Sequence, residues 1–445
     1  MRILIVGAGE VGSSIAASLA DTHEVVVVDI DPERVDALTY GEDVLAIEGD
    51  GTNLEILEEA GCEKADIVIA STDSDETNLA VTGTVDTVSD AFTIARVQKT
   101  AYLDTWRRSE GAFGVDFMVS TNLLAARVIV QVIGIPTARD VSPFAEGTVQ
   151  MAEFEVPADS PLADRSIAEI DHFDGLTFAA IIRDGDAIVP RGPDEIQWGD
   201  QVVVIGRPES VHQFATSLAP GGEADEADDV LIIGGSTTGG LVAGLLEERG
   251  YKPRLIEQSP DRARELAEAH PGTTVLEHDA NDVEFLEREH VRDADVVVAT
   301  LDSDARTLLA ALLAKQVGAD RAVAVVDEAQ YVELFEAVGV DVAVNPREVT
   351  AEEIARFTLE RRAENVAIIE SGTAEVLEFE VDQESIFADE KIKHAVQELP
   401  SGMVIGAITR EGAYVTPRGD TVIEVGDHLV LFVREESMDE VVAEV

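Results

Sequence analysis

The sequence predicts an α/β protein of two similar halves, each a parallel sheet flanked by helices and followed by a small α+β lobe. Early in each half, short β-branched runs alternate with amphipathic stretches, as in a parallel sheet covered by helices. Aromatic residues make up only 5% of the chain, whereas there are 34 glycines. This composition is typical of α/β layers that pack closely at glycine turns.

A repeat along the chain supports the division into halves. Gly7 and Gly234 are 227 residues apart, and Asp66 and Asp295 are 229 apart. ADIVIASTDSDETN and ADVVVATLDSDART share seven of fourteen residues, and the arginines of IIRDGD and AITREG also lie 227 apart. Later in each half, short strands alternate with turns such as RDGD and WGD, as expected of a small α+β lobe.

We expect seven consecutive segments. They are a first sheet domain (1–120), a crossover helix and linker (121–142), a first lobe (143–220), an acidic linker (221–229), a second sheet domain (230–348), a second crossover helix (349–368) and a second lobe (369–445). The strands of the first sheet are expected at Ile3–Val6, Glu24–Asp29, Asp43–Glu48, Ile67–Ala70 and Phe92–Val97. The apolar helix from Ser120 to Pro136 packs either within its own domain or against a partner subunit.

The charge balance restricts the classes of partner. The formal net charge is −57, so a nucleic-acid backbone is repelled. An acidic, lysine-poor surface combined with ample core residues predicts adaptation to a cytoplasm rich in salt. Cys62 is the single cysteine, and the N-terminus has no secretory signal pattern. The uncharged stretch Val230–Leu246 is shorter than the roughly 20 residues of a membrane span, so any membrane role is expected to be peripheral.

The first half begins with a glycine pattern that predicts a nucleotide site. It follows an apolar strand and opens a helix, and its residues are Gly7, Ala8, Gly9, Glu10, Val11 and Gly12. Gly7 permits the tight turn, Gly9 lets the backbone approach a pyrophosphate, and Gly12 lets the helix lie close to the sheet. The phosphates then lie at a helix N-terminus, whose dipole favours an anion.

Asp29 ends the second strand, where a carboxylate accepts the ribose hydroxyls of an adenosine. It would repel a 2′-phosphate, which favours NAD or an adenine mononucleotide over NADP. The alternative is that Asp29 only caps a loop. Thr72 and Asp73 follow the fourth strand at the same edge of the sheet, and Asp73 with Glu76 fits helix capping as well as ligand contact.

Arg96 ends the fifth strand on this edge. Its guanidinium could contact a phosphate, or it could form a surface ion pair.

The second half carries an altered copy of the glycine pattern. Its residues are Gly234, Gly235, Ser236, Thr237, Thr238 and Gly239, so Ser236 replaces Gly9. Glu257 keeps the ribose-binding carboxylate, whereas Val325 stands near the place of Arg96. Thr300 and Asp302 match Thr72, or its neighbour, and Asp73. This copy is either a second nucleotide site, with phosphate neutralisation in doubt, or a degenerate structural copy.

Features of an enzyme are missing from the sequence. A dehydrogenase needs a second domain that presents substrate and an acid–base residue to the nicotinamide, and none is evident. The eight histidines are scattered, and no zinc spacing, GxSxG, Walker or kinase pattern occurs. We therefore expect no catalytic residue and no metal site, and we interpret the bound ligand as a signal.

With GAGEVG, VVVVD, ADIVIASTDSDETN, IARV and WGD in this order and the whole arrangement duplicated, the chain resembles the TrkA family over its full length. These are peripheral regulatory subunits of Trk-type potassium uptake systems, built of RCK (KTN) domains. The resemblance implies Rossmann-like N-lobes, small C-lobes, and a homo-oligomeric ring on the cytoplasmic face of an integral membrane potassium transporter, modulated by NAD(H) or by ATP or ADP. Carried over by position, the ligand contacts are Gly7, Ala8, Gly9, Glu10, Val11, Asp29, Thr72, Asp73, Arg96, Gly234, Gly235, Ser236, Thr237, Thr238, Glu257 and Thr300.

The mechanism that the resemblance implies is a population shift. A ligand that binds one ring geometry better than another biases the gate by its differential affinity. The alternatives are a nucleotide-sensing module of another ion transporter or antiporter, and an NAD-dependent oxidoreductase.

Overall fold

The structure is a computed structural model, and its chain forms two compact units. One, the sheet unit, comprises Met1–Ile129 and Asp229–Thr358, and the other, the lobe unit, comprises Val130–Asp228 and Leu359–Val445. The residues described are 1–20, 22–41, 44–109, 111–135, 138–183, 185–219, 229–280, 282–359, 365–368, 374–383, 385–398, 403–410, 412–434 and 437.

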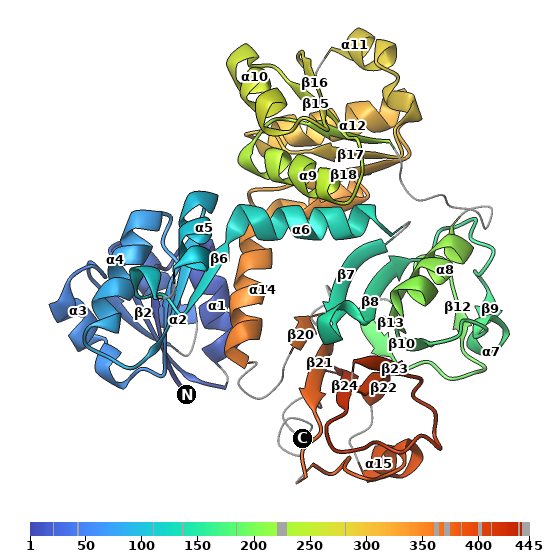
Figure 1. The fold of residues 1–445 in the computed structure, drawn as a ribbon, viewed down its shortest axis with the longest axis horizontal. Coiled ribbons are helices and arrows are strands. Elements are labelled where there is room, and N and C mark those ends of the chain that lie inside the picture. The colour runs from blue at the N-terminus through green and yellow to red at the C-terminus, as the bar shows by residue number, and fades with distance from the viewer. Residues whose placement is uncertain are drawn as a thin grey trace. The chain divides into compact units, whose positions relative to one another are not determined.

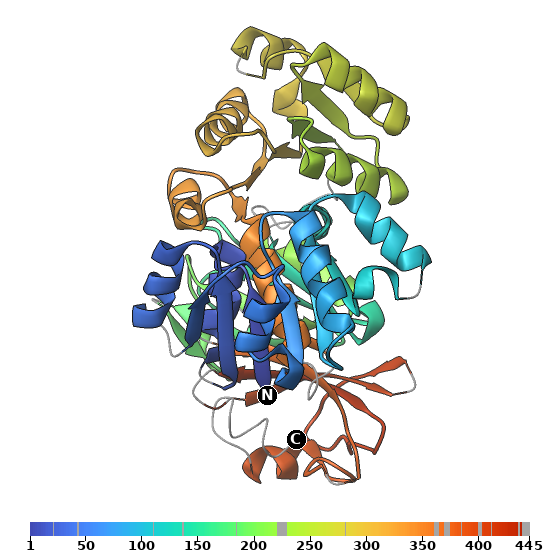
Figure 2. The same cartoon turned by 90° about the vertical axis from the view of Figure 1, so that its left-hand side faces the viewer.

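The first half contributes a six-stranded parallel sheet to the sheet unit, with the strand order β3-β2-β1-β4-β5-β6. Helices lie along this sheet (Figure 1, Figure 2). The strands are β1 (Arg2–Val6), β2 (Glu24–Asp29), β3 (Leu45–Glu48), β4 (Ile67–Ala70), β5 (Phe92–Val97) and β6 (Phe117–Ser120), and the helices are α1 (Glu10–Ala20), α2 (Pro32–Gly41), α3 (Leu54–Glu59), α4 (Asp75–Asp86) and α5 (Thr100–Arg108).

Apart from Arg2, the central strands β1 and β4 consist of apolar, mostly β-branched residues that are buried on both faces, which is why they have no polar alternation. Leu4 and Val68 contribute to a core that also contains Leu57 and Val81 from α3 and α4. The predicted strands are observed, with the start of the third one, Asp43, outside the described residues. Strand β6 was not predicted, because its four residues run directly into the next helix.

The second half builds a second sheet with the equivalent order, β16-β15-β14-β17-β18-β19. Ala70 pairs with Ala95 in the first sheet, and Ala299 pairs with Ala324 in the second, so Arg96 and Val325 occupy equivalent positions. The strands are β14 (Val230–Ile233), β15 (Arg254–Glu257), β16 (Thr274–Glu277), β17 (Val296–Ala299), β18 (Arg321–Val325) and β19 (Val342–Val344), and the helices are α9 (Thr237–Glu248), α10 (Pro260–Ala269), α11 (Val283–Arg288), α12 (Asp304–Val317) and α13 (Val332–Ala337). The predicted α/β class is thus observed in both halves.

The crossover helices begin directly after the last strand of each sheet. They are α6 (Thr121–Ile133) and α14 (Pro346–Leu359). Phe357 of α14 stacks on Phe117 and Phe92 of the first sheet, with ring centroids 4.1 and 5.3 Å apart. Helix α14 ends at Leu359, so the second crossover helix is shorter than the predicted range 349–368, and residues 365–368 form strand β20 instead. Burial of α6 against a partner subunit stays a prediction.

The lobe unit holds two five-stranded antiparallel sheets with equivalent orders, β11-β10-β13-β8-β7 and β20-β21-β24-β22-β23. The strands are β7 (Ala138–Phe144), β8 (Val149–Glu155), β10 (Leu176–Arg183), β11 (Asp186–Ile188) and β13 (Gln201–Gly206) in the first lobe, and β20 (Asn365–Ile368), β21 (Ala374–Glu380), β22 (Met403–Arg410), β23 (Ala413–Val415) and β24 (His428–Arg434) in the second. The first lobe also has a small sheet of β9 (Arg165–Ser166) and β12 (Glu195–Ile196), with α7 (Ile167–Ile170) and α8 (Pro208–Leu218), and the second lobe has α15 (Ile392–Glu398).

The glycine–aspartate turns of the two lobes have the same structural role. Arg183 Nε and Nη2 donate to the buried Asp200 carboxylate at 2.7 and 2.6 Å. Arg410 makes the same bidentate pair with the buried Asp427, at 2.7 and 2.8 Å. Each aspartate pins the turn to the neighbouring strand, because a buried carboxylate requires a charged partner.

Within the lobe unit, the two lobes share one apolar core. Phe144, Met151 and Val203 of the first lobe cluster with Val376 and Phe432 of the second. The amide N–H of Ala145 also donates to Glu378 Oε2 at 3.0 Å. The lobes therefore bury their apolar sheet faces against each other.

Two expectations concern other segments. In the acidic linker, residues 221–228 lie outside the described residues, whereas Asp229 accepts hydrogen bonds from Arg254, the shorter at 2.7 Å. Among the helices that the structure describes, none has the length and apolarity that crossing a membrane requires.

Candidate functional site

The glycine loop of the first half joins β1 to α1 and has no room for side chains. Gly7 has φ +108°, and a Cβ placed on it would lie 2.8 Å from the Thr72 backbone nitrogen. A Cβ on Gly12 would lie 1.8 Å from the carbonyl oxygen of Gly7. Both positions require glycine because the helix and the β4–α4 loop approach the turn so closely.

The loop is open at Gly9. A Cβ placed there would meet only Arg34 Nη1, at 3.6 Å. Helix α1 begins at Glu10, so its unpaired N–H groups and its positive dipole end lie beside this open position. A glycine cradle at a helix N-terminus fits a pyrophosphate. We use the name first pocket for the candidate site that comprises Gly7–Gly12, Asp29, Thr72, Asp73 and Arg96.

Asp29 lies beside the first glycine loop and is 8% exposed. Its Oδ2 accepts the Ala8 N–H at 2.5 Å, and its Oδ1 accepts the Asp31 N–H at 2.8 Å. The carboxylate therefore fixes the loop, which agrees with the alternative interpretation that Asp29 caps a loop. A carboxylate offers about four acceptor positions, and these hydrogen bonds use two of them, so contact with ribose hydroxyls is chemically compatible with the role in the loop.

Arg96 is buried, with an exposure of 4%, and it forms an ion pair with the exposed carboxylate of Asp73. Its Nε donates to Thr121 Oγ1 at 3.0 Å and its Nη1 to Asp73 Oδ1 at 3.2 Å. Burial lowers the pKa of Arg96, and the hydrogen bond and charge of Asp73 act in the opposite direction. This geometry places one cation next to Thr72 and Asp73.

Helix α4 is capped by a different residue from the one predicted. Ser74 is the N-cap, and its Oγ accepts the Thr77 N–H at 3.2 Å. Asp73 instead pairs with Arg96, so the capping role suggested for Asp73 is wrong.

Asn78 is a fully buried polar residue that sequence reasoning missed. Its Nδ2 donates to the carbonyls of Thr72 and Arg96 at 2.9 and 2.8 Å, and its Oδ1 accepts the Thr72 N–H at 2.9 Å. It thereby holds two predicted site residues in register.

The second half repeats the loop with a serine in place of Gly9. Gly234 has φ +105°, and a Cβ on Gly239 would lie 2.3 Å from the Gly234 carbonyl oxygen. Ser236, which replaces Gly9, is the N-cap of α9, and its Oγ accepts the Gly239 N–H at 3.1 Å. One N–H that would otherwise face an anion is therefore already paired.

Glu257 repeats the role of Asp29. It accepts the Gly235 N–H at 2.8 Å and the Ser259 N–H at 2.7 Å, which leaves lone pairs for a ligand. An arginine follows each carboxylate by five residues. Arg262 donates to the Gly235 carbonyl at 2.9 Å, and its counterpart Arg34 lies 3.9 Å from Asp29. Sequence reasoning missed both, although their equal spacing was a usable signal.

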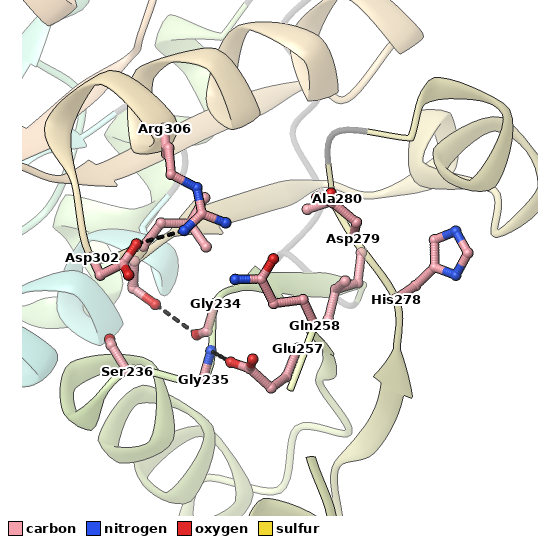
Figure 3. Close-up of a pocket in the computed structure, with 13 residues that line it drawn as sticks. Gly234, Gly235, Ser236, Glu257, Gln258, His278, Asp279, Ala280, Asp302 and Arg306 are labelled. Atoms are coloured by element: carbon pink, nitrogen blue, oxygen red, sulfur yellow. Dashed lines mark hydrogen bonds and ion pairs between the residues drawn. The ribbon is translucent and has the colours of Figure 1, made fainter. Parts of the chain in front are cut away.

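A cavity of about 170 Å³ opens beside the second glycine loop. Figure 3 shows Arg306 pointing at Asp302 above Gly234, while Glu257 closes on Gly235. Arg306 Nη1 donates to Asp302 Oδ1 at 2.7 Å. The lining residues are Gly234, Gly235, Ser236, Ile256, Glu257, Gln258, His278, Asp279, Ala280, Thr300, Leu301, Asp302 and Arg306. We call this site the second pocket.

Two expectations concern the second pocket. It has a cation, Arg306, which comes from the first turn of α12 rather than from the strand that carries Arg96 in the first half. Thr300 was expected to match Thr72 or its neighbour, and the structure identifies the neighbour, Ser71, because the N–H groups of Thr300 and Ser71 donate to equivalent carbonyls at 2.8 Å.

Two further predicted residues, Thr237 and Thr238, are not among the described residues that line the second pocket. The Thr238 hydroxyl donates to Asn122 of the first half at 3.3 Å.

Comparison with known proteins identifies the family. Residues 3–121 and 230–346 match the TrkA-N domain, and residues 151–219 and 376–445 match the TrkA-C domain. The chain belongs to the TrkA family. A Trk system potassium uptake protein TrkA homolog of Methanosarcina mazei is 35% identical over 99% of both chains, and one of Archaeoglobus fulgidus is 36% identical over 99% of both. TrkA of Halomonas elongata is 30% identical over 97% of this chain and 96% of its own.

Solved structures agree with the fold. The GsuK RCK domain superposes with a TM-score of 0.62 at 20% identity, over 99% of this chain and 95% of its own. The GsuK channel bound to NAD has a TM-score of 0.60 at 21% identity, over 99% of this chain and 79% of its own. These comparisons confirm the predicted tandem RCK architecture. The curated relatives are named for potassium uptake by Trk systems.

Proposed function

We propose that this TrkA chain senses NAD, in either redox state, or the adenine nucleotides ATP and ADP, and thereby gates a Trk-type potassium transporter. The observation that carries the proposal is the duplicated glycine loop, in which a helix N-terminus faces a carboxylate at the end of the second strand. Gly7, Gly9, Asp29 and Arg96 would hold the ligand in the first pocket, and Gly234, Ser236, Glu257 and Arg306 in the second.

The chemistry of the pockets favours an adenosine without a 2′-phosphate. Asp29 and Glu257 offer acceptors to ribose hydroxyls and repel a phosphate at the 2′ position. The NAD-bound GsuK channel, which has the same fold, supports NAD as a ligand. A second adenosine anion such as ADP satisfies the same contacts, which is why it belongs in the proposal.

The chain would act as a homo-oligomeric ring on the cytoplasmic face of its transporter. The curated relatives are named for Trk potassium uptake, which supports an integral membrane partner. A ligand that binds one ring geometry more tightly shifts the population toward it and moves the attached gate. The acidic surface, with a net charge of −57, is consistent with assembly in concentrated salt.

Calorimetry of the full chain in concentrated potassium chloride tests the proposal. NADH, NAD, ADP and ATP are titrated in turn, and at least one is expected to bind saturably. Asp29→Asn is expected to weaken binding about tenfold, because a neutral amide cannot form charge-assisted hydrogen bonds with the ribose hydroxyls. A chain that binds none of the four, or that oxidises NADH during the titration, contradicts the proposal.

Potassium flux tests the regulatory role. In membranes that contain the transporter, Asp29→Ala combined with Glu257→Ala is expected to remove the nucleotide dependence of uptake. Unchanged nucleotide-dependent flux would refute the role of the two pockets. Copurification with an antiporter instead of a Trk subunit would favour the alternative of another transport system.

A further inference from the structure

The two halves of the sheet unit contact each other at the first residues of the helices that follow their glycine loops. Asn122 of α6 accepts a hydrogen bond from Thr238 at the start of α9, at 3.3 Å. Arg347 of α14 donates to Glu10, the first residue of α1. Asn122 and Arg347 are equivalent, because each lies four residues after the strand residue that pairs with Ala95 or Ala324.

These two equivalent contacts differ in charge. The contact at the start of α9 joins a hydroxyl to an amide, whereas the contact at the start of α1 is an ion pair. Arg347 is 35% exposed, and its Nη1 also donates to the Asp327 carbonyl at 3.2 Å. The second half therefore supplies a fixed, partly exposed cation to the rim of the first pocket.

Electrostatics link Arg347 to the interior of the first pocket. Burial lowers the pKa of Arg347, but the hydrogen bond and charge of Glu10, with the charges of Asp73 and Asp327, raise it above its ordinary value. The charge of Arg347 in turn contributes to the lowered pKa of Arg96, behind the larger effect of burial. Arg347 thus lies within electrostatic reach of both members of the Asp73–Arg96 pair.

We infer that Arg347 is a specificity-determining residue of the first pocket, and that it favours nucleotides with more phosphate charge over the dinucleotide NAD. The inference rests on the proposed nucleotide binding. Phosphates held at the start of α1 are adjacent to Glu10, whose carboxylate they repel. Arg347 exchanges its bond to Glu10 for a phosphate oxygen, and the exchange is more favourable for a terminal phosphate that carries more charge.

The exchange also connects ligand charge to the junction of the two sheets. Arg347 is the second residue of α14, and Phe357 of the same helix stacks on the first sheet. A change at the Arg347–Glu10 pair therefore acts on α14, a helix of the second half that also contacts the first sheet.

Competitive calorimetry of the full chain carrying Glu257→Gln, which weakens the second pocket, tests the inference. NADH, ADP and ATP are titrated at one potassium chloride concentration. Arg347→Gln is expected to weaken ATP binding about tenfold and NADH binding no more than about threefold, because one charged contact is lost. Glu10→Gln is expected to tighten ATP binding about threefold. Asn122→Ala, the matched change at the equivalent contact, is expected to change none of the three.

The outcomes are separable. Equal weakening of all three ligands by Arg347→Gln, or no weakening, overturns the inference while nucleotide binding stands. A parent chain that binds no nucleotide overturns the proposed function and this inference together. Circular dichroism checks that each variant folds, and if Arg347→Gln does not, the gain expected for Glu10→Gln decides.

Discussion

The first and second pockets share a scaffold but obtain their cation from different elements. Asp29 and Glu257 each lock the glycine loop through two backbone N–H groups. In each pocket an arginine pairs with the aspartate of the loop, Asp73 or Asp302. This arginine is Arg96, near the end of strand β5, in the first pocket and Arg306, on helix α12, in the second. The backbone geometry of this fold is therefore constrained more tightly than the element that supplies the positive charge.

A second shared feature fixes the loops that carry Asp73 and Asp302, the aspartates that pair with these arginines. The Asp75 carboxylate accepts the N–H groups of Gln98 and Lys99 at 2.8 and 3.0 Å. Asp304 does the same for Asp327 and Glu328, at 2.8 and 3.2 Å. These ties hold the entry of α4 or α12 against the next strand, so the acid–arginine pair can vary while the loop stays in place.

The largest effect is expected where backbone atoms touch. Gly12→Ala places a methyl group against the Gly7 carbonyl, and it is expected to reduce the free energy of unfolding by about 3 kcal/mol. Gly239→Ala should do nearly the same in the second half. Gly9→Ala, which meets only the end of Arg34, is the control and should cost less than about 1 kcal/mol. Urea denaturation in potassium chloride measures all three, and equal losses would contradict the steric argument.

The two arginines are expected to separate stability from binding. Arg96→Ala removes a buried side chain that bonds to Thr121, and about 2 kcal/mol of stability should be lost. Arg306→Ala removes a partly exposed ion pair, and the loss should stay below about 0.5 kcal/mol. Arg306→Ala should still reduce the number of bound nucleotides that calorimetry detects. A large stability loss for Arg306→Ala would show that the two cations are structurally alike.

Exchanging the loop residue tests the effect of the cap. Ser236→Gly frees the Gly239 N–H, and it is expected to tighten the second pocket a few-fold while costing only a few tenths of a kcal/mol. Gly9→Ser should weaken the first pocket by a similar factor. If both substitutions leave nucleotide affinities unchanged, the serine does not compete with phosphate.

The smallest effect concerns pH and a contact of the first half. Lys99 Nζ donates to Glu76 Oε1 at 2.6 Å and Tyr102 donates at 3.1 Å, and these bonds lower the pKa of Glu76 from 4.5 to about 2. Because folding lowers this pKa, the contribution of the ionised Glu76 to stability is present above pH 4.5 and is lost as the pH falls toward 2. The second half has Ala305 at the equivalent position.

Carboxyl NMR titration measures this pKa directly. Lys99→Met is the control, and it should return the pKa of Glu76 toward its ordinary value. An ordinary pKa for Glu76 in the unmodified chain would refute the contact, which is exposed and therefore contributes little to stability.

The repeat and its glycine loops could be predicted because their physical requirements are local. Gly7 and Gly12 lie where a Cβ does not fit, and such positions are visible in a single sequence. Asp29 and Glu257 end strands at fixed distances from the loops, so their convergence follows from the parallel topology.

Other features depend on tertiary contacts that the sequence pattern does not contain. Arg306 was missed because a cation moved to another element leaves no equivalent residue to align. Asn78 was missed because an amide inside a helix has no special spacing, although its burial decides its role. The Arg347–Glu10 pair joins residues 337 positions apart, and no periodicity indicates it.

The common core of the two lobes has a consequence for the gene. Because Phe144 and Phe432 belong to one cluster, a polypeptide encoded by either half alone would leave that face uncovered. Fusing the halves in one reading frame guarantees one of each in every molecule. It also frees the two copies to diverge, since neither has to pair with an identical sister.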